Sequence, residues 1–182
     1  MSTVENFPGI SLVLGGARSG KSAFAERLAT LADRPRAYIA TGQAFDLEME
    51  ARIAQHRLDR GPDWQTIEAP LDILQALTEV SDGSVVLIDC LTLWLSNLML
   101  ADANIENEIE ILLTGLASAP EPIVFVSNEV GMGLVPDNQL GRRFRDAQGV
   151  LNREIAKRAD LAVFVAAGLP LLLKGELPEA LK

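Results

Sequence analysis

The sequence predicts an α/β fold in which a mostly parallel sheet carries helices on both of its faces. Three observations lead to this prediction. Short, almost continuously apolar runs recur along the chain, as expected for strands that are buried on both faces. Longer amphipathic stretches separate these runs, and such alternation of strand and helix is typical of a parallel sheet. The first apolar run leads directly into a glycine-rich turn, a connection that often precedes a phosphate-binding helix.

Each apolar run predicts one strand, and each amphipathic stretch predicts one helix. The predicted strands are Ile10–Leu14, Arg36–Ala40, the weaker Trp64–Glu68, Val85–Asp89, Ile123–Ser127 and Leu161–Ala166. The predicted helices are Gly20–Ala32, Asp46–Arg60, Asp72–Val80, Leu91–Ala117 with a break near Ala103, and Gln139–Ala159. In the second of these helices, the apolar residues Leu47, Ala51, Ala54 and Leu58 share one stripe, which we expect to face the core.

The length of 182 residues is that of one domain, so we expect residues 1–182 to fold as a single unit. We expect residues 1–9 and 174–182 to be loosely held ends. The stretch that begins at Gly168 contains two prolines and indicates either a loose tail or a last edge strand.

The composition excludes several classes of function. Lys and Arg number 16 against 25 Asp and Glu, a net charge of −9, and an acidic chain without a basic run predicts no nucleic-acid partner. A single cysteine, Cys90, and a single histidine, His56, exclude an internal disulfide and a His-pair zinc site. The chain has neither the long apolar run of a membrane span nor the basic start of a signal peptide. We therefore expect a cytoplasmic protein without a membrane span.

The string from Gly15 to Ser22 matches the phosphate-binding motif G-x-x-x-x-G-K-[ST] in full. Its glycines allow a tight loop with backbone N–H groups facing phosphate oxygens, and the positive helix end adds attraction. Lys21 is expected to reach the terminal phosphates and Ser22 to bind Mg²⁺. The chain is therefore predicted to have a P-loop NTPase fold. The loop residues expected to contact nucleotide are Gly15, Gly16, Ala17, Arg18, Ser19, Gly20, Lys21 and Ser22.

A P-loop usually works with an acidic residue at the end of an apolar strand, and Asp89 has that position. There it would hold Mg²⁺ through water. The same aspartate would also suit a helix cap before Leu91, and the presence of the P-loop favours the Mg²⁺ role. The adjacent Cys90 is expected to be buried packing.

The lone histidine, His56, falls on the side of its predicted helix that lies opposite the apolar stripe. One interpretation is a solvated surface residue. The other is a nucleophile, because a neutral imidazole can attack the α-phosphorus of a nucleotide and expel pyrophosphate. Arg52, Arg57 and Arg60 would then stabilise the phosphoryl charge. Spacing alone leaves both interpretations open.

The segment Asn128–Pro136 follows a predicted strand and contains two glycines and a proline. Because ligands bind at the carboxyl ends of parallel strands, this composition indicates a shaped loop. Arg142, Arg143 and Arg145 come soon after it, and they indicate either a solvated helix face or contacts with a phosphate or a partner subunit. The guanine signature N-K-x-D of regulatory GTPases is absent, since Glu129 follows Asn128.

Together these motifs resemble the bifunctional adenosylcobinamide kinase/adenosylcobinamide-phosphate guanylyltransferases of cobalamin biosynthesis. The resemblance extends from about residue 10 to residue 170. The segments that carry it are Gly15–Ser22, Tyr38–Thr41, Glu48–Arg57, Asn128–Pro136 and Phe144–Asp146.

The resemblance implies a RecA-like fold, a trimer and two reactions. The family phosphorylates the aminopropanol hydroxyl of adenosylcobinamide with a nucleoside triphosphate, GTP or ATP. It then transfers GMP from GTP to adenosylcobinamide phosphate through a GMP-histidine intermediate, which gives adenosylcobinamide-GDP and pyrophosphate. The implied nucleophile is His56, with Lys21 serving both reactions. Beyond the phosphate loop, the implied nucleotide contacts are Ala40, Thr41, Gly42, Arg57, Leu58, Asp59, Arg60, Glu68 and Asp89.

Three other functions stay open at the level of the sequence. A monofunctional P-loop small-molecule kinase would use the phosphate loop and Asp89 but would give His56 no role. A nucleotide-dependent assembly or DNA-binding module on a RecA-like core is another alternative, and the net charge of −9 argues against DNA as its partner. A nucleotide sensor would bind GTP without turning it over.

Overall fold

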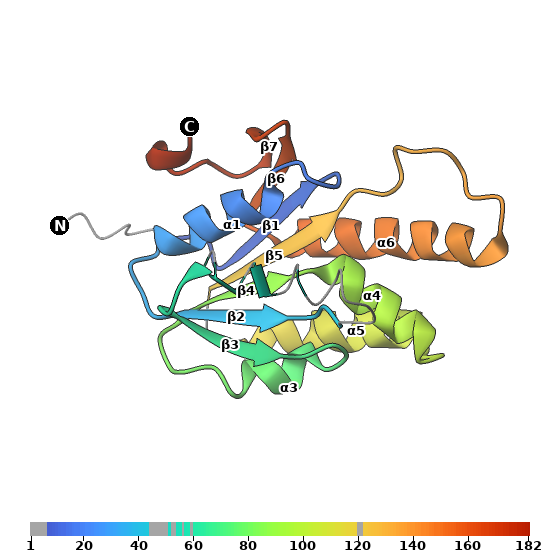
Figure 1. Cartoon of the computed structure of the whole chain (residues 1–182), viewed down its shortest axis with the longest axis horizontal. Coiled ribbons are helices and arrows are strands. Elements are labelled where there is room, and N and C mark those ends of the chain that lie inside the picture. Colours follow the sequence, from blue (N-terminus) through green and yellow to red (C-terminus); the bar gives the residue numbers. More distant parts are fainter. Residues whose placement is uncertain (1–6, 44–50, 52–53, 56, 59, 120–121) are drawn as a thin grey trace.

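A computed structural model describes residues 7–43, 51, 54–55, 57–58, 60–119 and 122–182. Its strands are β1 (Ile10–Gly15), β2 (Arg36–Ala40), β3 (Trp64–Glu68), β4 (Val85–Asp89), β5 (Ile123–Asn128), β6 (Leu161–Ala166) and β7 (Leu169–Lys174). They form one seven-stranded sheet in the order β3-β2-β4-β5-β1-β6-β7 (Figure 1). All neighbouring strands are parallel except β7, which runs antiparallel to β6.

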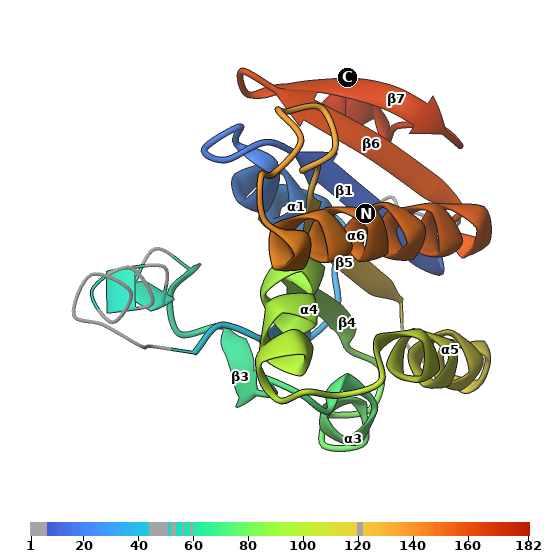
Figure 2. The same ribbon diagram turned by 90° about the vertical axis from the view of Figure 1, so that its right-hand side faces the viewer.

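Helices cover both faces of the sheet, as predicted. The helices are α1 (Lys21–Thr30), α3 (Ile73–Leu77), α4 (Leu91–Leu100), α5 (Ile105–Gly115) and α6 (Gln139–Arg158), with 3-10 helices at Leu116–Ser118 and Glu179–Leu181. One face carries α1, whose Phe24 and Leu28 pack against Val13. Helices α3, α4, α5 and α6 lie on the opposite face (Figure 2). Two apolar cores therefore sandwich the sheet, which explains the continuous apolar runs of its inner strands.

The predicted strands are confirmed, with β1 and β5 each one residue longer at the carboxyl end. The predicted break in the long fourth helix is also confirmed. α4 ends at Leu100, and α5 begins at Ile105. Asn104 explains the restart, because its side chain caps α5 by accepting a 3.0 Å hydrogen bond from the backbone N–H of Asn107.

The segment after Gly168 is the edge strand β7, one of the two alternatives left by the sequence. It forms a hairpin with β6 through Ala167 and Gly168, which have φ values of 52° and 78°. Two positive φ angles in a two-residue turn match the right-handed twist of the strands they join. Beyond β7, where we expected a loosely held end, the last 3-10 helix instead buries Leu181 beside α1.

One packing prediction is wrong. Ala51, Ala54 and Leu58 were expected to face the core, but all three are exposed, and Leu58 keeps 75% of its surface accessible. Leu47, the fourth residue of the stripe, lies outside the described residues. Periodicity identifies which residues share one side of a helix, but it does not identify what that side contacts.

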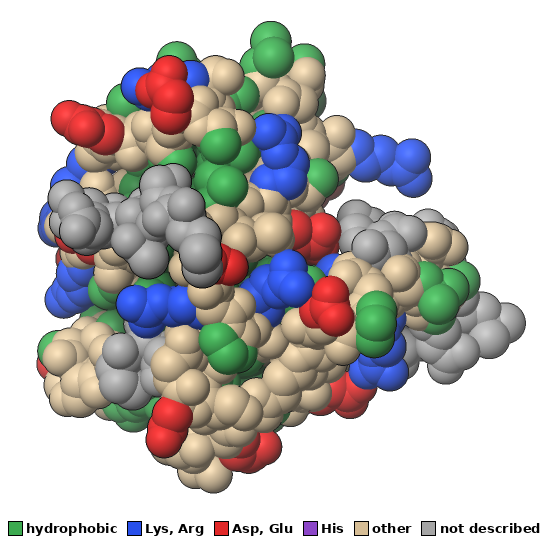
Figure 3. All heavy atoms as spheres, turned by 90° about the vertical axis from the view of Figure 1, so that its left-hand side faces the viewer, with side chains coloured by type: hydrophobic (Ala, Val, Ile, Leu, Met, Phe, Trp, Pro, Cys, Tyr) green, Lys and Arg blue, Asp and Glu red, His purple; other side chains and the backbone are tan. Residues whose placement is uncertain are grey.

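The parallel strands give the sheet a carboxyl end and an opposite, amino end. The parallel strands point toward the edge that carries the glycine-rich turn (Figure 1). On the face at the opposite, amino ends, basic and acidic side chains are interspersed (Figure 3).

Among the described residues, no helix is both long and apolar enough to cross a membrane.

Candidate active site

The strand order brings three carboxyl ends together in the middle of the sheet. β5 lies between β1, which leads into the phosphate loop, and β4, which ends at Asp89. The register pairs Gly15 with Asn128, and Asp89 lies beside Val126 of β5. The phosphate loop and the acidic residue therefore lie two strands apart at one edge, where open α/β sheets bind ligands.

The phosphate loop folds as its glycines require. Gly20, in the N-cap position of α1, has a φ of 94°, and a Cβ there would lie 3.2 Å from the Cα of Gly168. The N–H of Gly168 donates a 2.8 Å hydrogen bond to the carbonyl of Ser19. The β6–β7 turn thus supports the loop from the side, a contact that no local sequence signal announced.

The side chains of the loop lie close to its own backbone. A Cβ on Gly15 would meet the Ser19 hydroxyl at 2.4 Å and the Val165 carbonyl at 2.6 Å. The Lys21 ammonium donates a 3.2 Å hydrogen bond to the carbonyl of Gly16, which places its charge over the loop. Arg18 has a φ of 55° and is exposed. This arrangement of backbone and ammonium is suited to phosphate oxygens.

The residues expected to hold Mg²⁺ fit that ion. Ser22 and Asp89 are both partly exposed at the carboxyl edge. Cys90, not Asp89, occupies the N-cap position of α4, which removes the helix-cap interpretation of Asp89. No group of three or more His, Cys, Asp or Glu in the described residues could hold a metal by itself. Because Mg²⁺ bound with nucleotide phosphates needs only one or two protein oxygens, one hydroxyl and one carboxylate suit it.

The side-chain oxygen of Asn128 is buried at the end of β5, the strand that lies between β1 and β4. It accepts no hydrogen bond from any residue that the structure describes. Buried oxygens of this kind normally receive a donor, a water or a cation. The backbone N–H of Asn128 is held at 2.8 Å by the Thr92 hydroxyl. The end of β5 is therefore firmly positioned while this oxygen stays available.

The segment Ala40–Gly42 borders the same edge, and Thr41 holds it in place. The Thr41 hydroxyl donates to the Cys90 carbonyl and accepts from the Cys90 N–H, both at 2.8 Å. Asn97 of α4 donates to the Thr41 carbonyl at 2.8 Å. Thr41 is fully buried. Its hydrogen bonds connect the end of β2 to Cys90 and α4, beside Asp89.

Cys90 is buried as predicted. Burial, with a smaller effect of Asp89, raises the pKa of its thiol to about 11, and the charge of Lys21 lowers it slightly. A thiol with this pKa stays protonated near neutral pH and is a poor nucleophile. Cys90 is therefore packing.

The histidine segment is only partly described. His56, Asp59 and Arg52 lie outside the described residues, whereas residues 51, 54–55, 57–58 and 60 are helical. Arg57 forms an ion pair of 2.9 Å with Glu68, at the carboxyl end of β3. Two residues that were expected to contact nucleotide thus contact one another across the sheet edge.

Arg60 attaches the end of the same segment to β2. Its guanidinium carbon lies 3.4 Å from the centroid of the Tyr38 ring, and its buried Nε has no hydrogen-bond partner among the described residues. Tyr38 in turn meets Trp64 edge-on, with the ring centroids 6.3 Å apart. The sequence predicted a role for Arg60 from its charge and placed Tyr38 in a segment that carries the family resemblance, but it did not predict that the two side chains contact one another.

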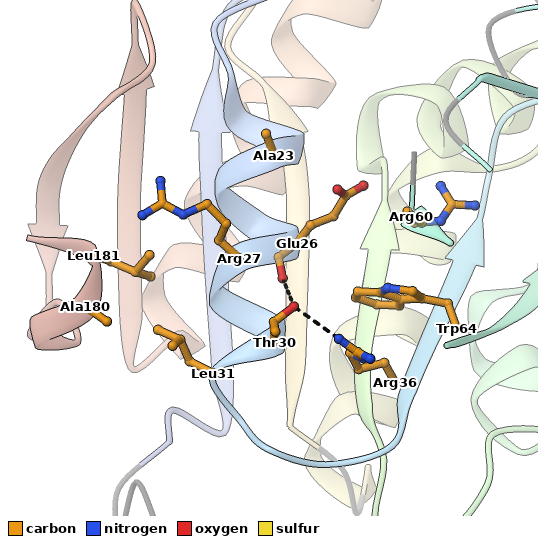
Figure 4. A pocket seen from close by; sticks show the side chains of 10 residues that line it. All are labelled: Ala23, Glu26, Arg27, Thr30, Leu31, Arg36, Arg60, Trp64, Ala180 and Leu181. Atoms are coloured by element: carbon orange, nitrogen blue, oxygen red, sulfur yellow. Dashed lines mark hydrogen bonds between the residues drawn. The ribbon is translucent and has the colours of Figure 1, made fainter. Parts of the chain in front are cut away.

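A hollow of about 480 Å³ opens beside this stack, between α1 and the strands β2 and β3 (Figure 4). Arg36 lines this hollow. Its guanidinium donates a 3.4 Å hydrogen bond to the Thr30 hydroxyl and forms a 3.4 Å ion pair with Asp63. None of the residues Gly15–Ser22 lines this hollow, so it lies apart from the phosphate loop. Its lining residues are Ala23, Glu26, Arg27, Thr30, Leu31, Arg36, Arg60, Trp64, Ala180 and Leu181.

Two of the three arginines after the β5 loop hold that loop, a role that neither sequence interpretation included. Arg145 of α6 donates to the carbonyl of Gly131. Arg142 donates to the carbonyls of Pro136 at 3.0 Å and Asp137 at 2.8 Å. Arginines spaced along one helix indicated a contact surface, but their partners turned out to be the backbone of the preceding loop.

Comparison with known proteins gives one family. A family model described as cobinamide kinase / cobinamide phosphate guanyltransferase matches residues 11–173. The chain is 49% identical over 168 residues to a bifunctional adenosylcobalamin biosynthesis protein, CobP, of Pseudomonas aeruginosa, covering 91% of this chain and 97% of that protein. It is 38% identical over 180 residues to CobU of Salmonella typhimurium, with the same description, covering 90% and 98%.

Solved structures with little sequence similarity share the fold. The flagellar accessory protein FlaH of Methanocaldococcus jannaschii has a TM-score of 0.51 at 15% identity, covering 93% of this chain and 80% of that one. The ATPase EscN of enteropathogenic E. coli has a TM-score of 0.56 at 11% identity, covering 88% and 43%. This likeness confirms the predicted P-loop NTPase fold and carries no statement about substrate.

Proposed function

Because the chain belongs to the cobinamide kinase / cobinamide phosphate guanyltransferase family, we propose how its own residues divide the two reactions between them. The enzyme is a kinase and a nucleotidyltransferase of cobalamin biosynthesis. The roles of individual residues, the identity of the nucleotides, the metal ion and the subunit arrangement are the content of the proposal.

In the kinase step, the acceptor hydroxyl attacks the γ-phosphorus of a nucleoside triphosphate bound at the phosphate loop. An O–P bond forms at the acceptor, the bond from the γ-phosphorus to the bridging oxygen breaks, and a nucleoside diphosphate leaves. Lys21 and the N–H groups of residues 15–22 neutralise the phosphate charge. GTP or ATP serves as the donor. Positioning supplies much of the rate, because phosphoryl transfer needs little covalent help from the protein.

Mg²⁺ would be held by the Ser22 hydroxyl and, through water, by Asp89, and it would supply charge neutralisation at the phosphates. The strand order supports this pairing, since both residues lie at the same sheet edge. The unpaired Asn128 oxygen offers an acceptor for water at the same place.

In the transfer step, a ring nitrogen of His56 attacks the α-phosphorus of GTP. A P–N bond forms, the bond to the bridging oxygen breaks, and pyrophosphate leaves. An oxygen of the acceptor phosphate then attacks the same phosphorus, breaks the P–N bond and frees the imidazole. Arg57 and Arg60, which flank the histidine, stabilise the phosphoryl charge.

The remaining nucleotide contacts belong to the segments that border this edge. Ala40, Thr41 and Gly42 follow β2, and Glu68 ends β3. The stretch Arg57–Arg60, including Leu58 and Asp59, connects to β3. We further propose that the enzyme works as a trimer, with sites near the contacts between subunits.

The observation that carries the proposal is the double attachment of the segment that contains His56. The Arg57–Glu68 ion pair and the Arg60–Tyr38 stack connect this segment to the sheet that ends in the phosphate loop. Both contacts hold residues that follow His56 in the chain against β2 and β3, two strands of the sheet whose carboxyl edge carries the phosphate loop.

The test is labelling with Mg²⁺ and GTP that carries the label on the α-phosphate. After denaturation, acid-labile and alkali-stable label should stay on the wild-type chain and be absent from the His56→Ala variant. Label on the γ-phosphate should not be retained. His56→Ala should still phosphorylate adenosylcobinamide. A folded wild type that binds GTP but retains no α-label would refute the histidine step and leave a monofunctional kinase.

A further inference from the structure

The loop after β5 exposes apolar side chains beside the phosphate loop. Met132 keeps 80% of its surface accessible, Leu134 96% and Val135 63%. Leu140, at the start of α6, keeps 61%. A single exposed leucine is ordinary, but four exposed apolar side chains between positions 132 and 140, in a loop at a ligand-binding edge, indicate an interaction surface.

The backbone of this loop is firmly held, although its side chains are exposed. Arg145 binds the Gly131 carbonyl, and Arg142 binds the carbonyls of Pro136 and Asp137. The Glu129 carboxylate accepts from the Gly131 N–H. A fixed backbone lowers the conformational cost of binding, because less freedom is lost when a partner arrives.

The loop adjoins the phosphate site directly. The N–H of Glu129 donates a 3.1 Å hydrogen bond to the carbonyl of Gly15, the first residue of the phosphate motif. From there the loop projects beyond the sheet edge and returns to α6 (Figures 1 and 2). On the other side of the phosphate loop, the β6–β7 turn places Leu169, which is 72% exposed.

We propose that Met132, Leu134, Val135 and Leu140 form the surface on which the corrin macrocycle of the cobinamide substrate rests. This inference rests on the proposed function, which requires the acceptor alcohol to reach the γ-phosphate at the phosphate loop. A corrin ring and its methyl groups present apolar surface between polar amide side chains, and the ring is much larger than the arm that ends in the alcohol. The ring must therefore lie against the protein next to the phosphate loop, where the described residues offer this held apolar surface.

The test is equilibrium dialysis of the full chain with adenosylcobinamide, Mg²⁺ and a non-hydrolysable GTP analogue, with bound corrinoid measured by its visible absorbance. Because the ring would bury the Leu134 side chain, Leu134→Ser should raise the dissociation constant for cobinamide about 10-fold or more. Affinity for the GTP analogue should not change, because Leu134 lies outside the phosphate loop. Ile111→Ser is the matched control, since Ile111 is an exposed apolar residue on α5, and it should leave both affinities unchanged.

Sedimentation of the same samples separates a ligand surface from a subunit contact. An unchanged mass for Leu134→Ser with weakened cobinamide binding supports the proposal. A changed mass of Leu134→Ser overturns the proposal. So does a Leu134→Ser variant that binds cobinamide as tightly as a wild type in which cobinamide binding is measured. A wild type that binds the nucleotide but no cobinamide contradicts the proposed function itself, and this inference with it.

Oxidation of Met132 gives a second readout that needs no substitution. Brief treatment with dilute peroxide, followed by mass spectrometry, measures the rate at which Met132 becomes the sulfoxide. Adenosylcobinamide should slow this rate several-fold relative to that of the half-buried Met99 in the same sample. An equal ratio of the two rates with and without cobinamide overturns the proposal.

Discussion

The guanidinium carbon of Arg60 lies 3.4 Å above the centre of the Tyr38 ring. This contact fixes the end of the histidine segment to β2, so the ring, and not the hydroxyl, should matter. We expect Tyr38→Phe to keep both reactions, whereas Tyr38→Leu should slow guanylyl transfer about 5-fold through loss of the cation–π contact. The kinase rate, which depends on the phosphate loop, should change much less. Separate assays of the two half-reactions measure this, and equal losses in both would contradict it.

The Arg57–Glu68 ion pair allows a test of whether these residues act together. Both side chains are more than half exposed, at 56% and 72%, so the pair should contribute less than about 1 kcal/mol to stability. If its role is to position the histidine segment, then Arg57→Met, Glu68→Gln and the double variant should slow guanylyl transfer by similar factors. Independent nucleotide contacts would instead give additive losses. Transfer rates of the four proteins, with urea melts as controls, decide between them.

The sequence predicts the inner strands β1, β2, β4, β5 and β6 well because each of them is largely buried on both faces, which leaves an apolar run that needs no context. It predicts the phosphate loop because each fixed position of that motif, the two glycines, the lysine and the hydroxyl residue, is required by phosphate or Mg²⁺ binding. The prediction that Leu58 faces the core was wrong because an apolar stripe shows which residues share one side of a helix but not what that side contacts. The support of Ser19 by Gly168 joins residues far apart in the chain, so no local pattern contains it. Arg145 was singled out by charge, but its partner Gly131 is a backbone carbonyl without any sequence signal.

Lys21→Ala should remove both activities while the protein stays folded. The ammonium makes one hydrogen bond, to the Gly16 carbonyl, and so contributes little to stability. Its charge near the phosphates should be worth a factor of about 100 to 1,000 in each reaction. Kinase assays and α-label retention measure the loss, and circular dichroism checks the fold. A variant that lost only one activity would mean that the two reactions use different phosphate sites.

Stability should fall at alkaline pH because of Cys90. Burial raises the pKa of its thiol from about 9 to about 11, so between these values the folded protein keeps a proton that the unfolded chain has lost. Stability then falls as pH rises through this window, by about 3 kcal/mol in total. Urea denaturation from pH 8 to 11 measures the slope. Cys90→Ala should flatten it, and an equal slope in that variant would assign the effect to other groups. Tyr38 is one such group, since burial raises its pKa too.

Neighbouring glycines of the phosphate motif should respond differently to the same substitution. A Cβ on Gly15 would lie 2.6 Å from the Val165 carbonyl of the adjacent strand, whereas a Cβ on Gly16 meets nothing within 4 Å. Gly15→Ala must therefore push β1 and β6 apart, and we expect it to cost about 1–3 kcal/mol of unfolding free energy. Gly16→Ala should change that free energy by less than about 0.5 kcal/mol. Urea melts of the two variants provide the comparison. Equal costs would mean that loss of glycine flexibility, not the contact between strands, governs the stability of this turn.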